Sequence, residues 1–229
     1  EQALDALRGL HAAGLPVIAV TGRPLGWSEP FAHAWPVAAI VPENGAVALI
    51  RQGKAVVTEY AQDAATRERN ARRLREVAVT VLAEIPGTAL ARDSAGRVTD
   101  IAIDHGEFAQ LDDTAIAQVV AVMQREGMSA TVSSIHVNGW FGDHTKLSGA
   151  RWMLRRLFGR ELDAERQRWV YVGDSTNDQA MFGYFPLSVG VANLCDFAPA
   201  LHTWPAYITD GARGAGFAEV AARLLAAHR

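Results

Sequence analysis

The sequence has few features of a disulfide scaffold, a membrane protein or a nucleic-acid-binding protein. Its 229 residues include one cysteine, Cys195, so no internal disulfide can form and a reducing compartment is the simpler expectation. No apolar run approaches the roughly 20 residues that a membrane-spanning helix needs. The formal net charge of −3 provides no basic field for nucleic acid or anionic lipid. We therefore expect a cytoplasmic protein without nucleic-acid or membrane partners; the sequence does not indicate its oligomeric state.

Several catalytic motifs are also missing. The seven histidines have no zinc-ligand spacing. His144 lies near Lys146, where contact with a substrate is one interpretation and a solvated loop residue is the favoured one. No G-x-S-x-G is present and Cys195 has no evident histidine partner, which argues against serine and thiol hydrolases. The glycines at 211, 214 and 216 do not have the dinucleotide-binding spacing. The sequence therefore argues against a zinc site, a serine or thiol hydrolase and a dinucleotide-binding loop.

The apolar residues that are present, 49% of the chain, are arranged as in an α/β protein. Leucines at helical spacing predict a helix over residues 3–13, and residues 16–20 and 37–41 are short apolar runs typical of buried parallel strands. Residues 146–159 predict a helix, and apolar runs at 169–173, 187–191 and 207–209 predict further strands. The pattern indicates a Rossmann-like, doubly wound parallel sheet.

A different pattern interrupts this sheet. Residues 46–50 and 55–60 flank a hairpin signal, 62–84 form an arginine-rich helical pattern, and 88–92 and 98–104 flank a second hairpin signal. A helix over 112–125 and strands at 129–133 and 135–141 follow. We therefore predict an inserted α+β cap over 46–143, within a core formed by 1–45 and 144–229, and expect the cap to move over the site.

Polar residues follow the first predicted strand, where an open α/β sheet binds its ligands. Thr21, Gly22 and Arg23 could offer a hydroxyl, backbone N–H groups and a guanidinium to one oxyanion. Taken alone, a simple strand-to-helix turn with Arg23 in solvent is the favoured explanation of these residues.

A second polar segment follows the strand at 169–173. Asp174, Asn177 and Asp178 could together form a hard-oxygen site for Mg²⁺. Ser175 and Asp178 also have the spacing of a helix capping box, which does not account for Asp174. Lys146 begins a predicted helix, where its charge opposes the macrodipole unless an anion or a carboxylate lies opposite.

Taken in order, V-T-G-R-P, the inserted module, Lys146 and V-G-D-S-T-N-D resemble the haloacid dehalogenase (HAD) superfamily over nearly the whole chain. The position and the helix–strand–strand repeat of the insertion resemble the C2 cap of type IIB, found in sucrose-phosphate and mannosyl-phosphoglycerate phosphatases and in phosphomannomutases. The resemblance implies a Mg²⁺-dependent phosphatase acting on a small phosphorylated substrate, a sugar phosphate above all, through an aspartyl-phosphate.

The resemblance also implies roles for individual residues. Thr21 and the backbone of Gly22 would bind the transferring phosphoryl group, and Lys146 would neutralise the nucleophilic carboxylate and a phosphate oxygen. Asp174 would hold Mg²⁺, and Asp178 with Asn177 would complete or orient its shell. Arg23 and Asn44 would face the cap and contact the leaving group.

One departure from the family pattern concerns the nucleophile. The family carries an Asp-x-Asp-Gly motif on a central strand well upstream of T-G-R, whereas no such motif precedes Thr21 here and Asp5 falls within a predicted helix. We therefore expect the nucleophile to lie upstream of residue 1, the chain as printed to be inactive, and the absent strand to leave a cleft through the apolar core. The alternatives are a phosphomannomutase-like phosphotransferase and a non-catalytic phospholigand-binding protein that lacks the nucleophile.

Overall fold

The first apolar runs form two parallel strands of the core. The computed structural model describes residues 1–228. In it, β1 (Ile18–Val20) pairs in parallel with β2 (Ala39–Val41), and α2 (Leu25–Ala34) connects the two strands. α1 (Gln2–Ala12) precedes them and buries Leu7 and Leu10. The short 3₁₀ helix η1 (Glu43–Gly45) follows β2 directly. Both strand assignments made from the apolar runs agree with the structure to within two residues.

A hairpin extends this sheet. β3 (Val47–Gln52) and β4 (Ala55–Tyr60) turn at Gly53, which has a φ of +62°, and β3 pairs antiparallel with β2. The first four residues of β3 are buried on both faces, so they pack as part of the core sheet. This pairing places β3 and β4 in the core sheet, whereas the sequence pattern placed residues 46–60 in the cap. The division of the whole chain into core and cap stays a prediction.

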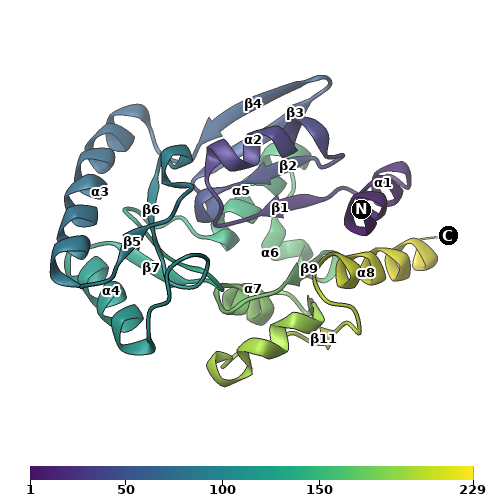
Figure 1. Ribbon diagram of the computed structural model, residues 1–229. Helices are drawn as coiled ribbons and strands as arrows, with labels where there is room; N and C mark the ends of the chain where they lie inside the picture. The colour runs from purple at the N-terminus through teal and green to yellow at the C-terminus, as the bar shows by residue number, and fades with distance from the viewer. Residues whose placement is uncertain (229) are drawn as a thin grey trace.

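A second group of parallel strands comes from the C-terminal third. β9 (Val170–Gly173), β10 (Leu187–Gly190) and β11 (Tyr207–Ile208) are parallel and lie in the order β11-β10-β9. The helices around them are α5 (Lys146–Phe158), α6 (Leu162–Glu165), η3 (Arg166–Arg168), η4 (Thr176–Asp178), α7 (Gln179–Tyr184), η5 (Ala192–Ala200) and α8 (Arg213–Ala227). α8 packs against α1, so the first and last helices of the described chain lie side by side (Figure 1).

The middle of the chain forms the α+β module that the sequence predicts. Its elements are α3 (Ala64–Glu84), β5 (Ala89–Leu90), η2 (Ser94–Gly96), β6 (Asp100–Asp104), α4 (Asp113–Arg125), β7 (Ser129–Val132) and β8 (His136–Trp140). The four strands are antiparallel in the order β5-β6-β8-β7. The two helices lie on the side away from the core (Figure 1). We call residues 62–141 the cap below.

The alternation along the cap strands separates an apolar face from a polar one. Ile103 and Val137 pack with Met123 and other side chains of α3 and α4. Asp100 and Asn138, at positions of the opposite parity, are buried on the face toward the core. None of the described helices has the length and apolarity that crossing a membrane requires.

Candidate active site

A cavity separates the two groups of core strands. It measures about 870 Å³ and is lined by β1, β9 and surrounding helices. Its wall is mainly apolar and includes Leu4, Leu7, Ile18, Leu154, Phe185 and Phe217. The residues of β1 and the first three of β9 are only half-buried, whereas those of β2 are fully buried. Among residues 1–228, the facing edges of β1 and β9 pair with no strand, so the expected cleft through the core is present.

The carboxyl ends of β1 and β9 both lie against the cap. After β1, the carbonyl oxygen of Gly22 accepts a hydrogen bond of 3.1 Å from Arg97 of the cap. After β9, the Thr176 hydroxyl donates a hydrogen bond of 2.8 Å to the carbonyl oxygen of Val132 in β7. The two strands therefore run in the same sense, and the loops that follow them meet beneath the cap. This is the edge where an open α/β sheet holds its ligands.

The loop after β9 surrounds the buried carboxylate of Asp178. Lys146, at the start of α5, donates hydrogen bonds to Asp178 Oδ1 at 2.6 Å and to Asn177 Oδ1 at 2.8 Å. The Tyr171 hydroxyl also donates to Asp178 Oδ1 at 2.6 Å, and the backbone N–H groups of Asp174 and Ser175 donate to Oδ2. The Asp178 carboxylate thus lies opposite Lys146, and Asp178 also completes a capping box with Ser175. The capping interpretation is thus confirmed, and the binding of Mg²⁺ by this segment stays a prediction.

The charges in this loop alter one another's ionisation. Burial alone would raise the pKa of Asp178, but the charge and hydrogen bond of Lys146 and the Tyr171 hydroxyl hold it below its ordinary value. Burial and the neighbouring Asp178 raise the pKa of Tyr171 far above its usual range, so this hydroxyl stays a donor. Desolvation and the charge of Asp178 raise the pKa of Asp174 above its ordinary value, with Lys146 opposing them. The loop holds more negative charge than its single lysine compensates.

Asp174 has the more accessible carboxylate of the two aspartates in this loop. It is exposed beside the cavity, whereas both oxygens of Asp178 accept hydrogen bonds from protein donors. No three His, Cys, Asp or Glu side chains converge as a metal site within the part of the chain that the structure describes. The donor set still fits Mg²⁺, because this ion binds through one or two carboxylates and retains water molecules. Asp174 would be its direct ligand, and Asp178 and Asn177 would orient the surroundings.

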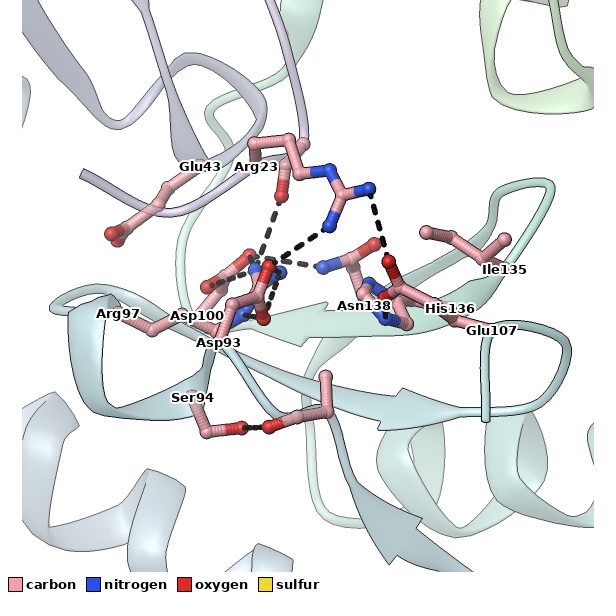
Figure 2. Close-up of polar contacts among 12 residues, drawn as sticks. Arg23, Glu43, Asp93, Ser94, Arg97, Asp100, Glu107, Ile135, His136 and Asn138 are labelled. Atoms are coloured by element: carbon pink, nitrogen blue, oxygen red, sulfur yellow. Dashed lines mark hydrogen bonds and ion pairs between the residues drawn. The ribbon is translucent and has the colours of Figure 1, made fainter. Parts of the chain in front are cut away.

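The loop after β1 holds the predicted phosphate-binding residues. The Thr21 hydroxyl accepts a hydrogen bond of 3.1 Å from the N–H of Arg23. The Arg23 guanidinium pairs with Asp93 at 3.3 Å and with Glu107 at 3.5 Å, both in the cap (Figure 2). Arg23 is therefore not the free solvent-exposed arginine of a simple turn. Thr21 and Asp174 follow the strands on the two sides of the cavity, and Lys146 reaches across from α5, which packs on β1.

Cap residues far away in sequence complete this polar junction. Arg97 is 2% exposed in its side chain, and it binds Asp93 and Asp100 as well as Gly22 (Figure 2). Burial raises the pKa of Asp100 to about 7, with Arg97 opposing the rise and Glu43 adding to it. Sequence reasoning missed Arg97 and Glu43, because they contact one another's loops only in the folded chain. The sequence points to Glu43 only through its position just after a buried strand, and it has no local feature that points to Arg97.

His144 differs from its expectation. It is 5% exposed and its ring stacks on that of Trp140 at 5.6 Å, so the solvated interpretation is wrong. Its burial lowers the pKa of the imidazole to about 4. The physical reason is that the linker from β8 to α5 runs beneath the cap sheet, where Trp140 Nε1 donates to the carbonyl oxygen of His144 at 3.0 Å.

Comparison with known proteins gives a fold but no close relative. No family model and no curated sequence matches the chain. Among solved structures, a Thermoplasma acidophilum protein has a TM-score of 0.71 at 15% identity, covering 97% of this chain and 88% of its own. The sucrose-phosphatase of Synechocystis sp. PCC6803, solved with sucrose and phosphate, has a TM-score of 0.69 at 15% identity, covering 97% and 91%. A sugar phosphatase of HAD subclass IIB has a TM-score of 0.62 at 16% identity, covering 97% and 90%.

The chain has the HAD fold. The structural match covers 97% or more of the chain, and it includes proteins named as a HAD subclass IIB sugar phosphatase, a sucrose-phosphatase and a trehalose-6-phosphate phosphatase related protein. The resemblance drawn from V-T-G-R-P and V-G-D-S-T-N-D is thereby confirmed at the level of the fold.

Proposed function

We propose that this protein is a Mg²⁺-dependent phosphomonoester hydrolase that acts on a small phosphorylated metabolite, most directly a sugar phosphate, through an aspartyl-phosphate. The observation that carries the proposal is the pair formed by Lys146 and Asp178, with Asp174 exposed next to it beneath a cap. The structural similarity to sucrose-phosphatase and to a subclass IIB sugar phosphatase supports the choice of substrate class. When bound at Asp174, Mg²⁺ would supply positive charge to the transferring phosphoryl group.

In this proposal the residues of the chain bind and orient the substrate. The Thr21 hydroxyl and the N–H of Gly22 hold phosphoryl oxygens, and Lys146 neutralises charge between the phosphate and the attacking carboxylate. Asp178 holds the Lys146 ammonium in place through the contact of 2.6 Å. Arg23 and Asn44 lie on the cap side and contact the leaving group. Together they provide the positioning and the charge compensation that phosphoryl transfer requires.

The nucleophile in this proposal belongs to a strand that occupies the cavity between β1 and β9. An extended segment there would pair with both free edges and cover their half-buried side chains. Its carboxyl end would fall between Thr21 and Asp174, where the first aspartate of an Asp-x-Asp motif could attack phosphorus while the second gives its proton to the leaving ester oxygen. Water, losing a proton to the second aspartate, would then cleave the acyl phosphate, release inorganic phosphate and restore both aspartates. Asp174 and Glu1 are the only carboxylic residues among those that line the cavity.

A substrate panel with a matched pair of variants tests this function. Hexose phosphates and p-nitrophenyl phosphate should release inorganic phosphate in Mg²⁺ and not in EDTA when the complete protein is assayed. Lys146→Met should lower kcat by several orders of magnitude, whereas Lys54→Met, which changes the only other lysine and an exposed one, should not. Isomerised sugar phosphate without phosphate release would show a phosphomutase instead. Tight binding without turnover in the complete protein would show a phospholigand-binding protein.

A further inference from the structure

Glu43 is a fully buried carboxylate at the junction of core and cap. Its relative exposure is 0%, although it belongs to a loop rather than to a strand or a long helix. Its oxygens accept hydrogen bonds from the N–H of Val98 at 3.0 Å, the N–H of Thr99 at 2.6 Å and the Thr99 hydroxyl at 2.5 Å. Only one donor comes from the core, the N–H of Leu25 at 2.9 Å. The cap therefore supplies most of the partners that allow this charge to be buried.

The loop that carries Glu43 has an unusual backbone. Glu43, Asn44 and Gly45 all have positive φ, at +50°, +54° and +105°. Such a conformation costs free energy in a residue with a side chain, so it persists only where surrounding contacts fix it. At Gly45 a side chain is excluded altogether, because a Cβ atom would overlap the carbonyl oxygen of Thr145. Contacts with the cap and with α5 thus hold this loop in shape.

The same loop is bonded to the phosphate-binding segment. The N–H of Glu43 donates to the carbonyl oxygen of Arg23, and the N–H of Asn44 donates to that of Thr21, both at 3.0 Å. A continuous set of hydrogen bonds therefore runs from Thr99 in the cap through Glu43 to the residues that follow β1. Displacement of the cap removes the Val98 and Thr99 donors and leaves the Glu43 carboxylate with one protein partner.

Asn44 has a donor that the protein does not use. Its side chain is 2% exposed, and Nδ2 donates to no other atom of residues 1–228. An unpaired buried donor is costly, and such groups are found where a ligand completes the bonding. The amide lies beside Gly22: a Cβ atom there would be 3.1 Å from Asn44 Oδ1 and 3.6 Å from Oδ1 of the cap residue Asn138. The free donor thus lies between the phosphate-binding loop and the cap.

We propose that Glu43 is a positioning residue that couples cap closure to the phosphate-binding loop, and that closure thereby sets Asn44 Nδ2 as a donor to an oxygen of the leaving group. The coupling itself stands on the contacts of Glu43. The identity of the ligand at Asn44 rests on the proposed function. A leaving group with a hydroxyl, such as a sugar, fits this donor. Its hydroxyl oxygen can accept from Asn44 Nδ2 while its proton is donated to the side-chain oxygen Oδ1 of Asn138.

Hydrogen exchange measured by mass spectrometry tests the coupling without any turnover. Glu43→Gln and the milder Thr99→Val should speed exchange about tenfold or more at the amides of Val98 and Thr99, because bonds to a charged acceptor contribute most of their protection. The amides of Glu43 and Asn44 should speed up in parallel. Thr80→Val, a change of the same kind on the outer cap helix, should alter neither segment. Faster exchange in the cap alone, or in neither segment with both variants, overturns the coupling.

Calorimetric titration of residues 1–229, for which no turnover is expected, with hexose 6-phosphate and with inorganic phosphate, each with Mg²⁺, tests the role of Asn44. Asn44→Gly removes the donor and tolerates the positive φ, so it should weaken hexose 6-phosphate binding about tenfold and change phosphate binding less than about twofold. Equal losses for both ligands would assign Asn44 to the phosphoryl group and overturn the leaving-group role. If neither ligand binds the unmodified protein, the proposed function fails together with the role of Asn44, while the hydrogen-exchange result still decides the coupling.

Discussion

Replacing Lys146 by methionine should expose how the buried charge of Asp178 is held. Methionine keeps the apolar stem of lysine and removes the ammonium that lies 2.6 Å from Asp178 Oδ1. The two side chains are 12% and 3% exposed, so water cannot replace the lost partner without a rearrangement. The Tyr171 hydroxyl and the N–H groups of Asp174 and Ser175 remain as neutral donors.

The magnitude follows from the cost of an uncompensated buried charge. Removing one partner of a buried pair typically costs about 3–5 kcal/mol, a large part of a domain's stability of about 5–15 kcal/mol. In the unmodified protein the lowered pKa of Asp178 contributes stability above the ordinary value of 3.8, which is lost as the pH falls through the folded value. Without Lys146 the effect of burial prevails and raises this pKa. The variant should therefore lose stability as the pH rises from about 4 toward neutrality.

Urea unfolding at about pH 5 and about pH 8 measures both effects, with Lys54→Met as the control on an exposed lysine. The loss for Lys146→Met should be larger at the higher pH, and Asp178→Asn in the same chain should recover part of it. The argument that Lys146 compensates the charge of Asp178 would be refuted if Lys146→Met lost less than about 1 kcal/mol of unfolding free energy and had the same pH dependence as Lys54→Met.

Three further changes have expected outcomes. Asp174→Asn should abolish any Mg²⁺-induced rise in Tm and cost less than about 1 kcal/mol of unfolding free energy in the absence of metal, because the side chain is exposed; an intact rise in Tm would remove Asp174 from the metal site. Arg97→Met should cost about 3–5 kcal/mol in urea unfolding, since it leaves the buried Asp100 without a cationic partner; the idea fails if the cost is that of a surface arginine such as Arg223. His144→Phe should make stability less sensitive to acid between pH 6.5 and about 4, because the lowered pKa of buried His144 makes the folded state lose stability as the pH falls through that range; unchanged pH dependence in urea unfolding would show that His144 does not titrate on unfolding.

The secondary structure was largely predictable because its signals are local. The apolar runs at 16–20, 37–41 and 169–173 correspond to β1, β2 and β9, and the helix expected at 146–159 is α5. The cap order of helix, two strands, helix and two strands also agrees. The hairpin at 46–60 was expected in the cap but pairs with β2 of the core sheet. Its alternation and its turn indicate a hairpin, but they do not indicate which sheet it joins.

The candidate site was predictable only where its residues are adjacent in sequence. Asp174, Asn177 and Asp178 share one loop, and Lys146 could be suspected because its charge is misplaced at a helix start. The Glu43–Thr99 contact joins residues 56 positions apart, and Arg97 reaches Gly22 across 75 positions. Such contacts depend on how the cap lies on the core, which no local pattern specifies. The burial of His144 was missed for the same reason.

The central claim is that a strand in the cavity between β1 and β9 supplies the nucleophile, and a side-by-side phosphatase assay tests it most directly. Residues 1–229 alone are compared with the same chain preceded by an Asp-x-Asp-Gly strand long enough to enter the cavity, using p-nitrophenyl phosphate with Mg²⁺ and with EDTA. The account predicts Mg²⁺-dependent turnover in the extended chain and none in residues 1–229. It also predicts that changing the first aspartate of the added strand to asparagine abolishes this turnover. Equal Mg²⁺-dependent turnover by residues 1–229 alone would contradict the account.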